Sequence, residues 1–323
     1  MIKMQTKPGD FAKILLALLV ALALCGCQTC KTPLEPQICY EPPLQLIETL
    51  PTSFPVLTTP DYRYDWAKEL LMGNVFAHEQ DYYRAITCYK RALILLPKKE
   101  EQRRQQIEYD IVLSYYLGKK YLDTINTFEA SSLVQASSAF PAYRELLIML
   151  YDAYKQVGSE SAEAKACQIL NLLQTLEPET AAQEQLSQAV IEADFTYMYS
   201  QESLPLANML LGYETQAKSV QKARTLNALL PGAGYLYVGQ KQAALTSFII
   251  NGLFIAAAYH FFSHKNIAAG AIVSSLEFGW YFGGINGAGL AATEYNERLY
   301  ECAAKDFLIN QKLFPVLLFQ HAF

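Results

Sequence analysis

The sequence predicts an all-α protein in which a series of helical repeats precedes a hairpin of two membrane helices. Aromatic and small residues recur at helical spacing between residues 61 and 200. Two long apolar runs, 243–262 and 267–292, follow in the last third of the chain. The composition agrees with this division, because 52% hydrophobic and only 18% charged residues indicate that part of the chain leaves water.

The first 26 residues (1–26) have the layout of an export signal. Lysines precede an uninterrupted apolar run at 14–24, and small or thiol residues follow it. Residues 24–27 resemble a bacterial lipobox, and this resemblance implies that Cys27 is acylated and becomes the new amino terminus. Cys25 departs from the lipobox, which usually has Ala, Ser or Thr at that position. An uncleaved anchor and another cleavage site therefore stay open, and each version exports the rest of the chain.

Residues 27–60 are predicted to form an extended, proline-rich linker. Half of the 14 prolines of the chain lie between residues 31 and 60, among Thr, Glu and Gln and without apolar periodicity. Such a composition favours a spacer over a packed core. We expect this linker to separate the membrane from the helical repeats.

A helix pair is predicted between Trp66 and Pro97. Its characteristic residues are Met72, Gly73, Phe76, Ala85, Tyr89, Ala92 and Pro97. Their offsets resemble those of a tetratricopeptide repeat, in which a small residue lets the second helix approach the first and a proline ends the pair. The resemblance implies tetratricopeptide-like helical repeats, which stack and serve protein interaction.

Two further pairs are predicted in the segment 61–200, which we expect to be the whole repeat region. Extra residues at 98–104 lengthen the connection to the second pair. That pair repeats the aromatic and small positions at Tyr115, Tyr121, Thr124, Ile125 and Phe128. The third pair, from Leu146 to Pro178, keeps Tyr151, Tyr154, Ala166 and Leu170, with its turn at Gly158. An ordinary helical bundle with the same spacing stays open as an alternative.

The tetratricopeptide resemblance implies a groove on the inner helices that holds a protein or peptide ligand. Asn74, His78 and Tyr115 are the inner-helix positions that we expect to contact this ligand. Nucleic acid is not an expected partner, because a net charge of −5 and a pI near 5.5 provide no basic face.

A membrane module is predicted at residues 226–299, after a connector at 201–225. The run 243–262 is about 30 Å long as a helix, which matches the hydrocarbon core of a bilayer. After a short break, the run 267–292 is again apolar. The two runs together predict a transmembrane helical hairpin.

Small residues in the second apolar run recur every four positions. They are Ala271, Ser275, Gly279, Gly283 and Gly287. Such a row permits close approach of helices in lipid, where van der Waals contact drives association. We expect Gly252 and Ala256 in the first run to face this row, so that the hairpin packs on itself. Self-association and docking onto another membrane protein stay open.

Two polar residues lie within the apolar runs, Asn251 in the first and Glu277 in the second. A carboxylate at such a depth costs on the order of a few kcal/mol unless it meets a donor or water. We expect Glu277 to form a structural hydrogen bond with Asn251 or with nearby tyrosines. The alternatives are an intramembrane proton or substrate site, and a shallow helix that lets Glu277 reach the membrane interface.

The stretch 222–299 resembles a short membrane module that follows tetratricopeptide repeats in some bacterial envelope proteins. The residues that carry the resemblance are Leu230 to Gly234, Tyr237, Gly239, Asn251, Glu277 to Gly279, Trp280, Tyr281, Gly284, Tyr295 and Asn296. The resemblance implies an envelope location and leaves open a supporting role in membrane-protein biogenesis.

The segment 300–323 is predicted to be an apolar tail that lies on the membrane, because it is too short to span a bilayer comfortably. The orientation of the module stays open. The signal-like terminus and the linker favour export of the repeats, whereas the positive-inside rule favours the opposite orientation. The basic residues behind that second argument are Lys218, Lys222, Arg224 and Lys241.

The predicted function is that of a membrane-anchored tetratricopeptide scaffold in the bacterial cell envelope, with the repeats in the periplasm and the hairpin in the inner membrane. Protein or peptide ligands and membrane lipid are the expected partners. The chain has no serine elbow, phosphate loop or metal-spaced His/Glu set, so we predict no catalytic residue, no cofactor and no metal site. An accessory component of a transport or protein-insertion complex, and a lipoprotein of the outer-membrane assembly machinery, are the alternatives.

Overall fold

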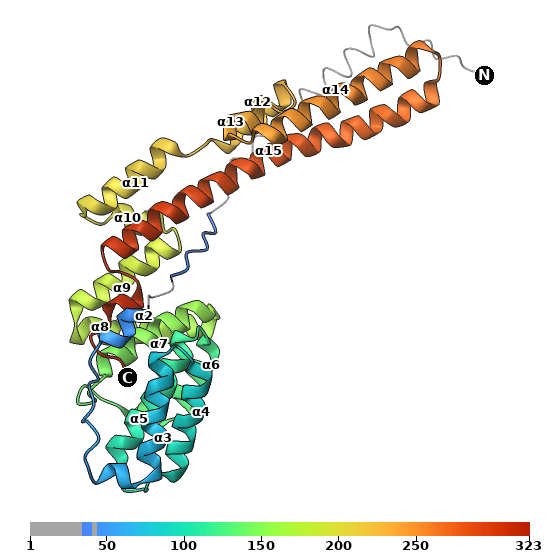
Figure 1. The fold of residues 1–323 in the computed structure, drawn as a ribbon. Coiled ribbons are helices and arrows are strands. Elements are labelled where there is room, and N and C mark those ends of the chain that lie inside the picture. Colours follow the sequence, from blue (N-terminus) through green and yellow to red (C-terminus); the bar gives the residue numbers. More distant parts are fainter. Residues whose placement is uncertain (1–33, 41–43) are drawn as a thin grey trace. The chain divides into compact units, whose positions relative to one another are not determined.

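The computed structural model describes residues 34–40 and 44–323, and these residues are almost entirely helical (Figure 1). The predicted all-α class is thereby confirmed. Within the described ranges no strand forms, and β pairing is limited to one isolated parallel bridge between Thr52 and Ala322. The predicted export signal and its acylation site Cys27 lie outside the described residues.

The helices from α3 to α9 follow one another as a stack, which we call the repeat stack after the repeats predicted there. Their bounds are Asp65–His78 (α3), Tyr82–Leu95 (α4), Glu101–Leu117 (α5), Tyr121–Glu129 (α6), Tyr143–Val157 (α7), Glu160–Leu176 (α8) and Pro178–Ile191 (α9). Each helix contacts the next one along the chain, and α5 also contacts α7. Neighbours in sequence are therefore neighbours in space, as in proteins built from consecutive helix pairs.

Local chemistry sets several ends of these helices. The Asp81 carboxylate accepts a hydrogen bond from the Arg84 N–H (3.0 Å) at the start of α4. Ser159 Oγ accepts one from the Ala162 N–H (3.2 Å) at the start of α8. Gly158 ends α7 with a φ of 62°, a left-handed conformation that glycine adopts without strain. The predicted turn at Gly158 is confirmed.

The first helix pair packs as its spacing predicts. A Cβ on Gly73 would lie 2.4 Å from Cε1 of Tyr89, so only glycine lets this ring reach α3. Tyr89, Ala85 and Ala92 have no exposed surface. The Tyr89 hydroxyl donates to Asn74 Oδ1 (3.0 Å), which fixes the ring between the two helices.

Two predicted details of the repeat region differ in the structure. The connection between α4 and α5 is residues 96–100, longer than the connections at 79–81 and 118–120, but the second part of the charged run, 101–104, belongs to α5. Pro178 is the first residue of α9 rather than the end of a pair. Proline fits there, since the first helical residue has no intrahelical use for an N–H.

The predicted connector at 201–225 is helical. It contains α11 (Leu204–Gln216), preceded by the short α10 (Phe195–Tyr199), and the first part of α12 (Val220–Leu229). Leu206, Leu210 and Tyr213 are buried on one face of α11, at the spacing of an amphipathic helix. This face packs against a distant element, α15.

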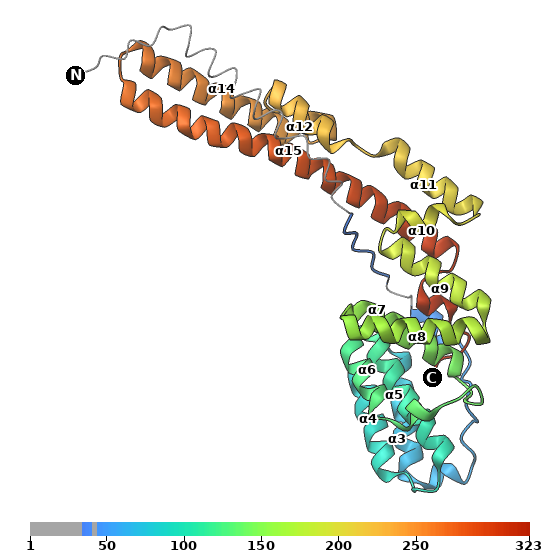
Figure 2. The same cartoon turned by 180° about the vertical axis from the view of Figure 1, so that it is seen from behind.

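Two long helices, α14 (Lys241–Ser263) and α15 (Ile267–Asn310), run side by side as a helical hairpin (Figure 2). The short α13 (Ala233–Val238) packs against both of them. Among the described residues one helix, α14, is long and apolar enough to cross a membrane. The predicted second span is the first part of α15, whose 44 residues extend about 66 Å at a rise of 1.5 Å per residue.

The predicted boundary at residue 299 lies inside α15, which continues to Asn310. Its last third packs on α9 and α11. Tyr300 is buried there, and its hydroxyl donates to the carbonyl of Val190 (2.8 Å). The ring of Tyr300 packs edge-to-face on Tyr213, with the centroids 5.4 Å apart. One continuous helix therefore contacts both the hairpin partner and the repeat stack.

Residues 313–323, called the tail from here on, do not lie on a membrane surface as predicted. Most of their side chains are buried against the repeat stack. The tail contains one turn of 3₁₀-helix, Pro315–Leu318, which contacts α7 and α9. The predicted linker also packs in part on this stack, because Ile47 in α2 (Leu44–Thr49) and Phe54 are buried. Apolar residues without helical periodicity anchor both segments, as single residues in the linker and as the continuous run 313–319 in the tail.

Candidate partner-binding surfaces

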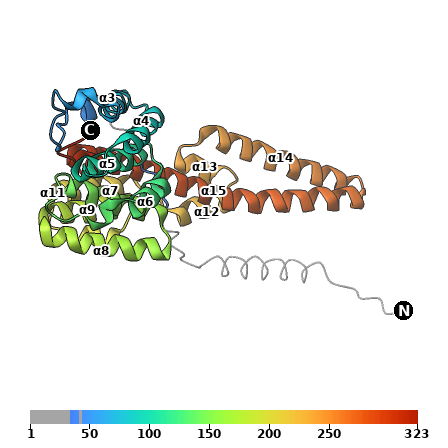
Figure 3. The ribbon, with the colours of Figure 1, turned by 90° about the horizontal axis from the view of Figure 1, so that it is seen from below.

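The C-terminal end of the chain lies beside α3 and α5 (Figure 3). There the tail contacts a surface of the repeat stack that we call the repeat groove, formed by His78, Tyr89, Tyr116, Arg144 and Glu145. The Phe323 ring stacks on Tyr89 (centroids 6.3 Å apart) and meets the edge of His78 (6.2 Å). Phe319 packs on Tyr116 (6.0 Å). Two aromatic anchors, four residues apart, thus enter sites made by different helix pairs.

Polar groups fix the tail backbone between its aromatic anchors. The Arg144 guanidinium donates to the Leu318 carbonyl (2.6 Å), and the Gln320 N–H donates to the Glu145 carboxylate (3.1 Å). The Ala322 N–H donates to the Pro51 carbonyl (3.0 Å). Main-chain hydrogen bonds combined with buried side chains are the pattern by which proteins hold an extended peptide.

The three residues predicted to line a partner groove have different environments. His78 meets the tail, and Asn74 is engaged by the Tyr89 hydroxyl. Tyr115 accepts a hydrogen bond from Lys90 Nζ (3.0 Å) and lines a separate cavity of about 550 Å³ between α4, α5 and α6. The chain's own tail occupies the position at His78 where we predicted an external ligand.

Carboxyl groups are buried beneath and beside the tail. They are Asp110, Glu145, Asp152 and Glu184. Burial raises the pKa of Asp110 well above its usual range, although the Arg103 guanidinium partly offsets this. Burial and the neighbouring Asp152 likewise raise the pKa of Glu184 well above its usual range. Within the described ranges neither oxygen of Asp110 has a hydrogen-bond partner, and His78 Nδ1 has none either.

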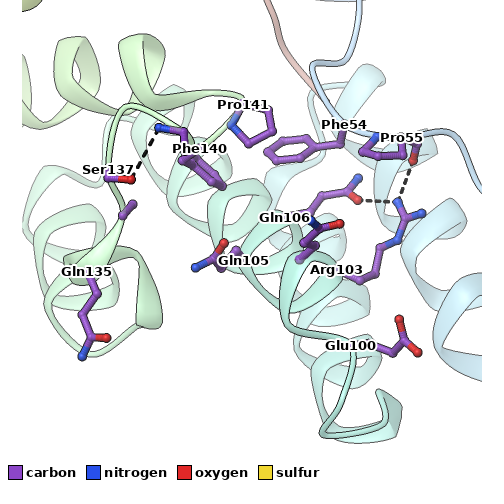
Figure 4. A pocket seen from close by; sticks show the side chains of 13 residues that line it. Phe54, Pro55, Glu100, Arg103, Gln105, Gln106, Gln135, Ser137, Phe140 and Pro141 are labelled. Atoms are coloured by element: carbon purple, nitrogen blue, oxygen red, sulfur yellow. Dashed lines mark hydrogen bonds between the residues drawn. The ribbon is translucent and has the colours of Figure 1, made fainter.

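Figure 4 shows a polar cavity of about 410 Å³ where the linker meets the repeat stack. The Arg103 guanidinium donates both to the Pro55 carbonyl (2.7 Å) and to Gln106 Oε1 (2.6 Å). Phe54 and Phe140 form its apolar side, with their ring centroids 5.6 Å apart. The arginine is used to hold the linker in place, and the linker in turn pairs with the tail through Pro51.

The hairpin exposes large apolar side chains along its outer faces. They include Leu245, Phe248, Leu253, Ile255 and Tyr259 on α14 and Ile267, Ile272, Leu276, Phe278 and Trp280 on α15. An apolar surface of this extent on a folded domain marks a site that a membrane or another apolar partner covers.

The predicted packing of Gly252 and Ala256 against the small-residue row of α15 is wrong. A Cβ added to Gly252, Gly279 or Gly283 would have no atom within 4 Å, and Ala256, Ala271 and Ser275 are exposed. Gly270 contacts Phe262 instead, and Gly287 contacts Tyr235. Part of the row lines an open groove of about 740 Å³ between α14 and α15.

Asn251 is buried, and its amide donates to the Ser247 carbonyl one turn earlier in α14 (2.6 Å). Among the described residues no hydrogen bond joins Asn251 to Glu277. Asn251 Oδ1 and Glu277 Oε2 are both shielded from water and lack a partner there. The predicted structural hydrogen bond between them is therefore not formed in this structure.

The other polar residues that carry the resemblance to an envelope module hold α12, α13 and α15 together. Asn296 accepts from the Lys218 N–H (2.7 Å) and donates to the Lys218 carbonyl (2.9 Å). Tyr281 donates to the Ala228 carbonyl. A Cβ on Gly234 would lie 2.3 Å from the carbonyl oxygen of Ala223, so glycine permits this contact.

The described ranges contain no group of three or more His, Cys, Asp and Glu side chains that would hold a metal ion. No protein-family model matches the chain, and neither the curated proteins nor the solved structures provide a match. Function must therefore be inferred from the surfaces themselves.

Sequence reasoning missed the repeat groove's occupant. A signal was present, because the tail contains three phenylalanines and no acidic or basic residue after Lys312 other than His321. Such a segment favours burial. We interpreted that apolar character as affinity for lipid, and the pattern alone does not distinguish lipid from a protein groove.

Proposed function

We propose that this protein is a membrane-anchored helical scaffold of the bacterial cell envelope, whose tetratricopeptide-like repeats bind a protein or peptide segment. The observation that carries the proposal is the combination, in one chain, of a stack of helix pairs and a hairpin whose large apolar side chains face outward. The hairpin would insert into the inner membrane, and the repeats would present the repeat groove to a partner in the periplasm.

The outward apolar side chains support membrane insertion. Leu253 lies near the middle of α14 and is 65% exposed. Each Å² of apolar surface that leucine side chains expose to water costs about 25 cal/mol of free energy. Lipid would remove that cost, and α14 has the length that a bilayer requires.

Leu253→Lys tests insertion, with Leu122→Lys as its matched control. Leu122 is equally exposed (62%) but lies on α6 in the repeat stack. In a Cys27→Ser background, which removes the proposed acyl anchor, we expect Leu253→Lys to lose membrane retention after alkaline carbonate washing, because a lysine at mid-bilayer costs about 2.5–3.5 kcal/mol on insertion scales. Leu122→Lys should stay in the membrane fraction. Wild-type chain that washes off intact would contradict the anchoring proposal.

Acylation at Cys27 would supply a second anchor, and we keep it as part of the proposal. Metabolic labelling with a radioactive fatty acid should label the wild type and not Cys27→Ser. The variant should still resist carbonate washing through α14. Equal labelling of both chains would show that the acylation site lies elsewhere.

A role as an accessory component of a membrane transport or insertion complex is the second candidate. The observation that favours it is the pair of shielded, unpartnered oxygens on Asn251 and Glu277 in facing helices. A buried polar group without a partner is costly and needs a reason. If this candidate is correct, Glu277→Gln should reduce substrate transport or membrane-protein insertion by the complex, while the abundance of the variant chain stays normal. Unchanged flux would favour a structural use of the carboxylate.

A further inference from the structure

The repeat groove holds the tail in the way that a binding site holds a peptide, although the tail belongs to the same chain. Phe319 and Phe323 are buried in aromatic sites of the stack. Arg144 holds the backbone just before Phe319, at the Leu318 carbonyl, and Glu145 holds it between the two rings, at the Gln320 N–H. This surface therefore already shows the chemistry that it recognises.

We propose that the tail is a resident, displaceable ligand of the repeat groove, and that the external partner is an apolar protein segment with two phenylalanines four residues apart. The partner would compete with the tail for the sites of Phe319 and Phe323. This inference rests on the proposed partner-binding function, and it specifies both the partner's chemistry and the step that regulates its binding.

The fit between tail and groove supports displacement. His78 Nδ1 is shielded from water beside Phe323 and has no partner in the described ranges. Burial raises the pKa of Tyr89, on which Phe323 stacks, and the nearby Asp110, whose oxygens also lack a partner in the described ranges, raises it further. The tail thus leaves hydrogen-bonding groups beside it without partners. An external segment that supplies a donor would form hydrogen bonds that the tail does not form.

The connection between the tail and α15 also supports this assignment. Gln311 and Lys312 join the end of α15 to Leu313, and Lys312 adopts a φ of 54°. A ligand tethered through so short a link acts at an effective concentration on the order of mM or above. A free peptide at micromolar concentration should therefore bind poorly until the tail is weakened.

The first experiment measures binding of a fluorescent synthetic peptide with the sequence of residues 311–323 to the full-length chain in detergent. The double variant Phe319→Ala with Phe323→Ala weakens the tail. Its matched control is Phe248→Ala with Phe278→Ala, which removes two exposed phenylalanines of the hairpin. We expect at least about tenfold tighter binding to the tail variant than to the wild type and the control, because affinity scales with the fraction of open groove.

Two binding results would overturn the proposal. If wild type and tail variant bind the peptide equally, the groove is open and the tail does not regulate it, although partner binding itself stands. If the folded tail variant does not bind the peptide, the groove does not recognise this chemistry. Membrane retention is measured separately, so a failure of anchoring leaves the peptide result unaffected.

The second experiment needs no variant and guards against misfolding. Native-state hydrogen exchange of the wild type reports how the amides of Gln320 and Ala322 become exposed. A displaceable tail predicts that these amides exchange through a local opening while those of α5 and α7 stay protected. Exchange of the tail only together with α5 and α7 would make it an integral part of the core and would overturn the proposal.

Discussion

Gly73 shows how one residue sets the distance between two helices. Its missing side chain leaves room for the Tyr89 ring, which is buried and bonded to Asn74. The ring cannot move away without losing both its burial and its hydrogen bond. The position therefore tolerates no side chain, although it lies in a helix where alanine is intrinsically favoured.

We expect Gly73→Ala to lower the free energy of unfolding by about 1–3 kcal/mol, the usual cost of overpacking a core. Gly212→Ala in α11 is the matched control, because a Cβ there has no atom within 4 Å. That control should be neutral or stabilising by up to about 1 kcal/mol. Chemical denaturation in detergent measures both values, and an equal response of the two variants would contradict the packing argument.

The same reasoning limits what substitution at the predicted groove residues can reveal. Asn74→Ala removes the acceptor of the Tyr89 hydroxyl, so this substitution would lower the stability of the fold as well as affect binding. His78 has no such partner in the described ranges and contacts the tail directly. His78 is thus the better residue for a binding test.

At the scale of elements, α15 is the helix with the most varied surroundings. Its first part pairs with α14, its middle packs against α12 and α13, and its end packs on α9 and α11. Tyr300 marks the last of these contacts, where its hydroxyl reaches the Val190 carbonyl at the end of α9. This hydrogen bond joins residues 110 positions apart in the chain.

We expect Tyr300→Phe to destabilise the contact between α15 and α9 by about 0.5–1.5 kcal/mol, the net value of a typical buried hydrogen bond. Tyr199→Phe is the control, because the Tyr199 hydroxyl bonds to Glu214 on an exposed surface. Thermal unfolding followed by circular dichroism compares the two. If Tyr199→Phe lowers the stability as much as Tyr300→Phe, burial of the hydrogen bond does not determine how much it stabilises the fold.

The local sequence pattern predicted the helices better than it predicted which distant segments pack against them. The first helix pair followed from the spacing of Gly73, Ala85 and Tyr89, which depends on residues at most 16 positions apart. The contact of Phe323 with His78 has no such local signal. A short apolar tail fits lipid and protein equally well, and the competition between the two depends on the folded groove.

The hairpin shows a second limit of the pattern. A row of small residues every four positions lies on one face of a helix, but the sequence does not state which neighbour this face meets. In the structure Gly270 lies against Phe262 and Gly284 near Asn227, whereas Gly279 and Gly283 stay exposed. The predicted self-packing of the row failed for this reason, whereas docking onto a second membrane helix stays a prediction.

At the scale of the whole molecule, the carboxyl groups of Asp110, Asp152 and Glu184 are buried in the repeat stack. Burial raises the pKa of Asp110 and of Asp152, and it raises that of Glu184 together with the charge of Asp152. An acid whose pKa is higher in the folded than in the unfolded chain stabilises the fold only while it is protonated. The contribution of these three groups to stability should therefore be highest below the usual carboxyl pKa and fall as the pH rises toward the raised values.

We expect the melting temperature to fall between pH 5 and pH 8, and Asp110→Asn to reduce that fall by a few degrees. The amide of asparagine cannot ionise, so its contribution does not change with pH. Asp65→Asn is the control, since Asp65 is exposed and Lys68 lowers its pKa. Melting curves at several pH values test this, and an unaltered pH dependence in Asp110→Asn would show that Asp110 does not carry the effect.

The length of α15 has a mechanical consequence. A rotation of this helix about its own axis moves its final turn, and two residues further on Leu313 and Phe314 are already buried, with the Phe314 ring stacked on Tyr40. In the proposed arrangement, a rotation of the hairpin and exchange of the bound tail are coupled, and thermodynamic reciprocity makes each sensitive to the other. The helix would then transmit rotation from the hairpin to the end of the chain that fills the repeat groove.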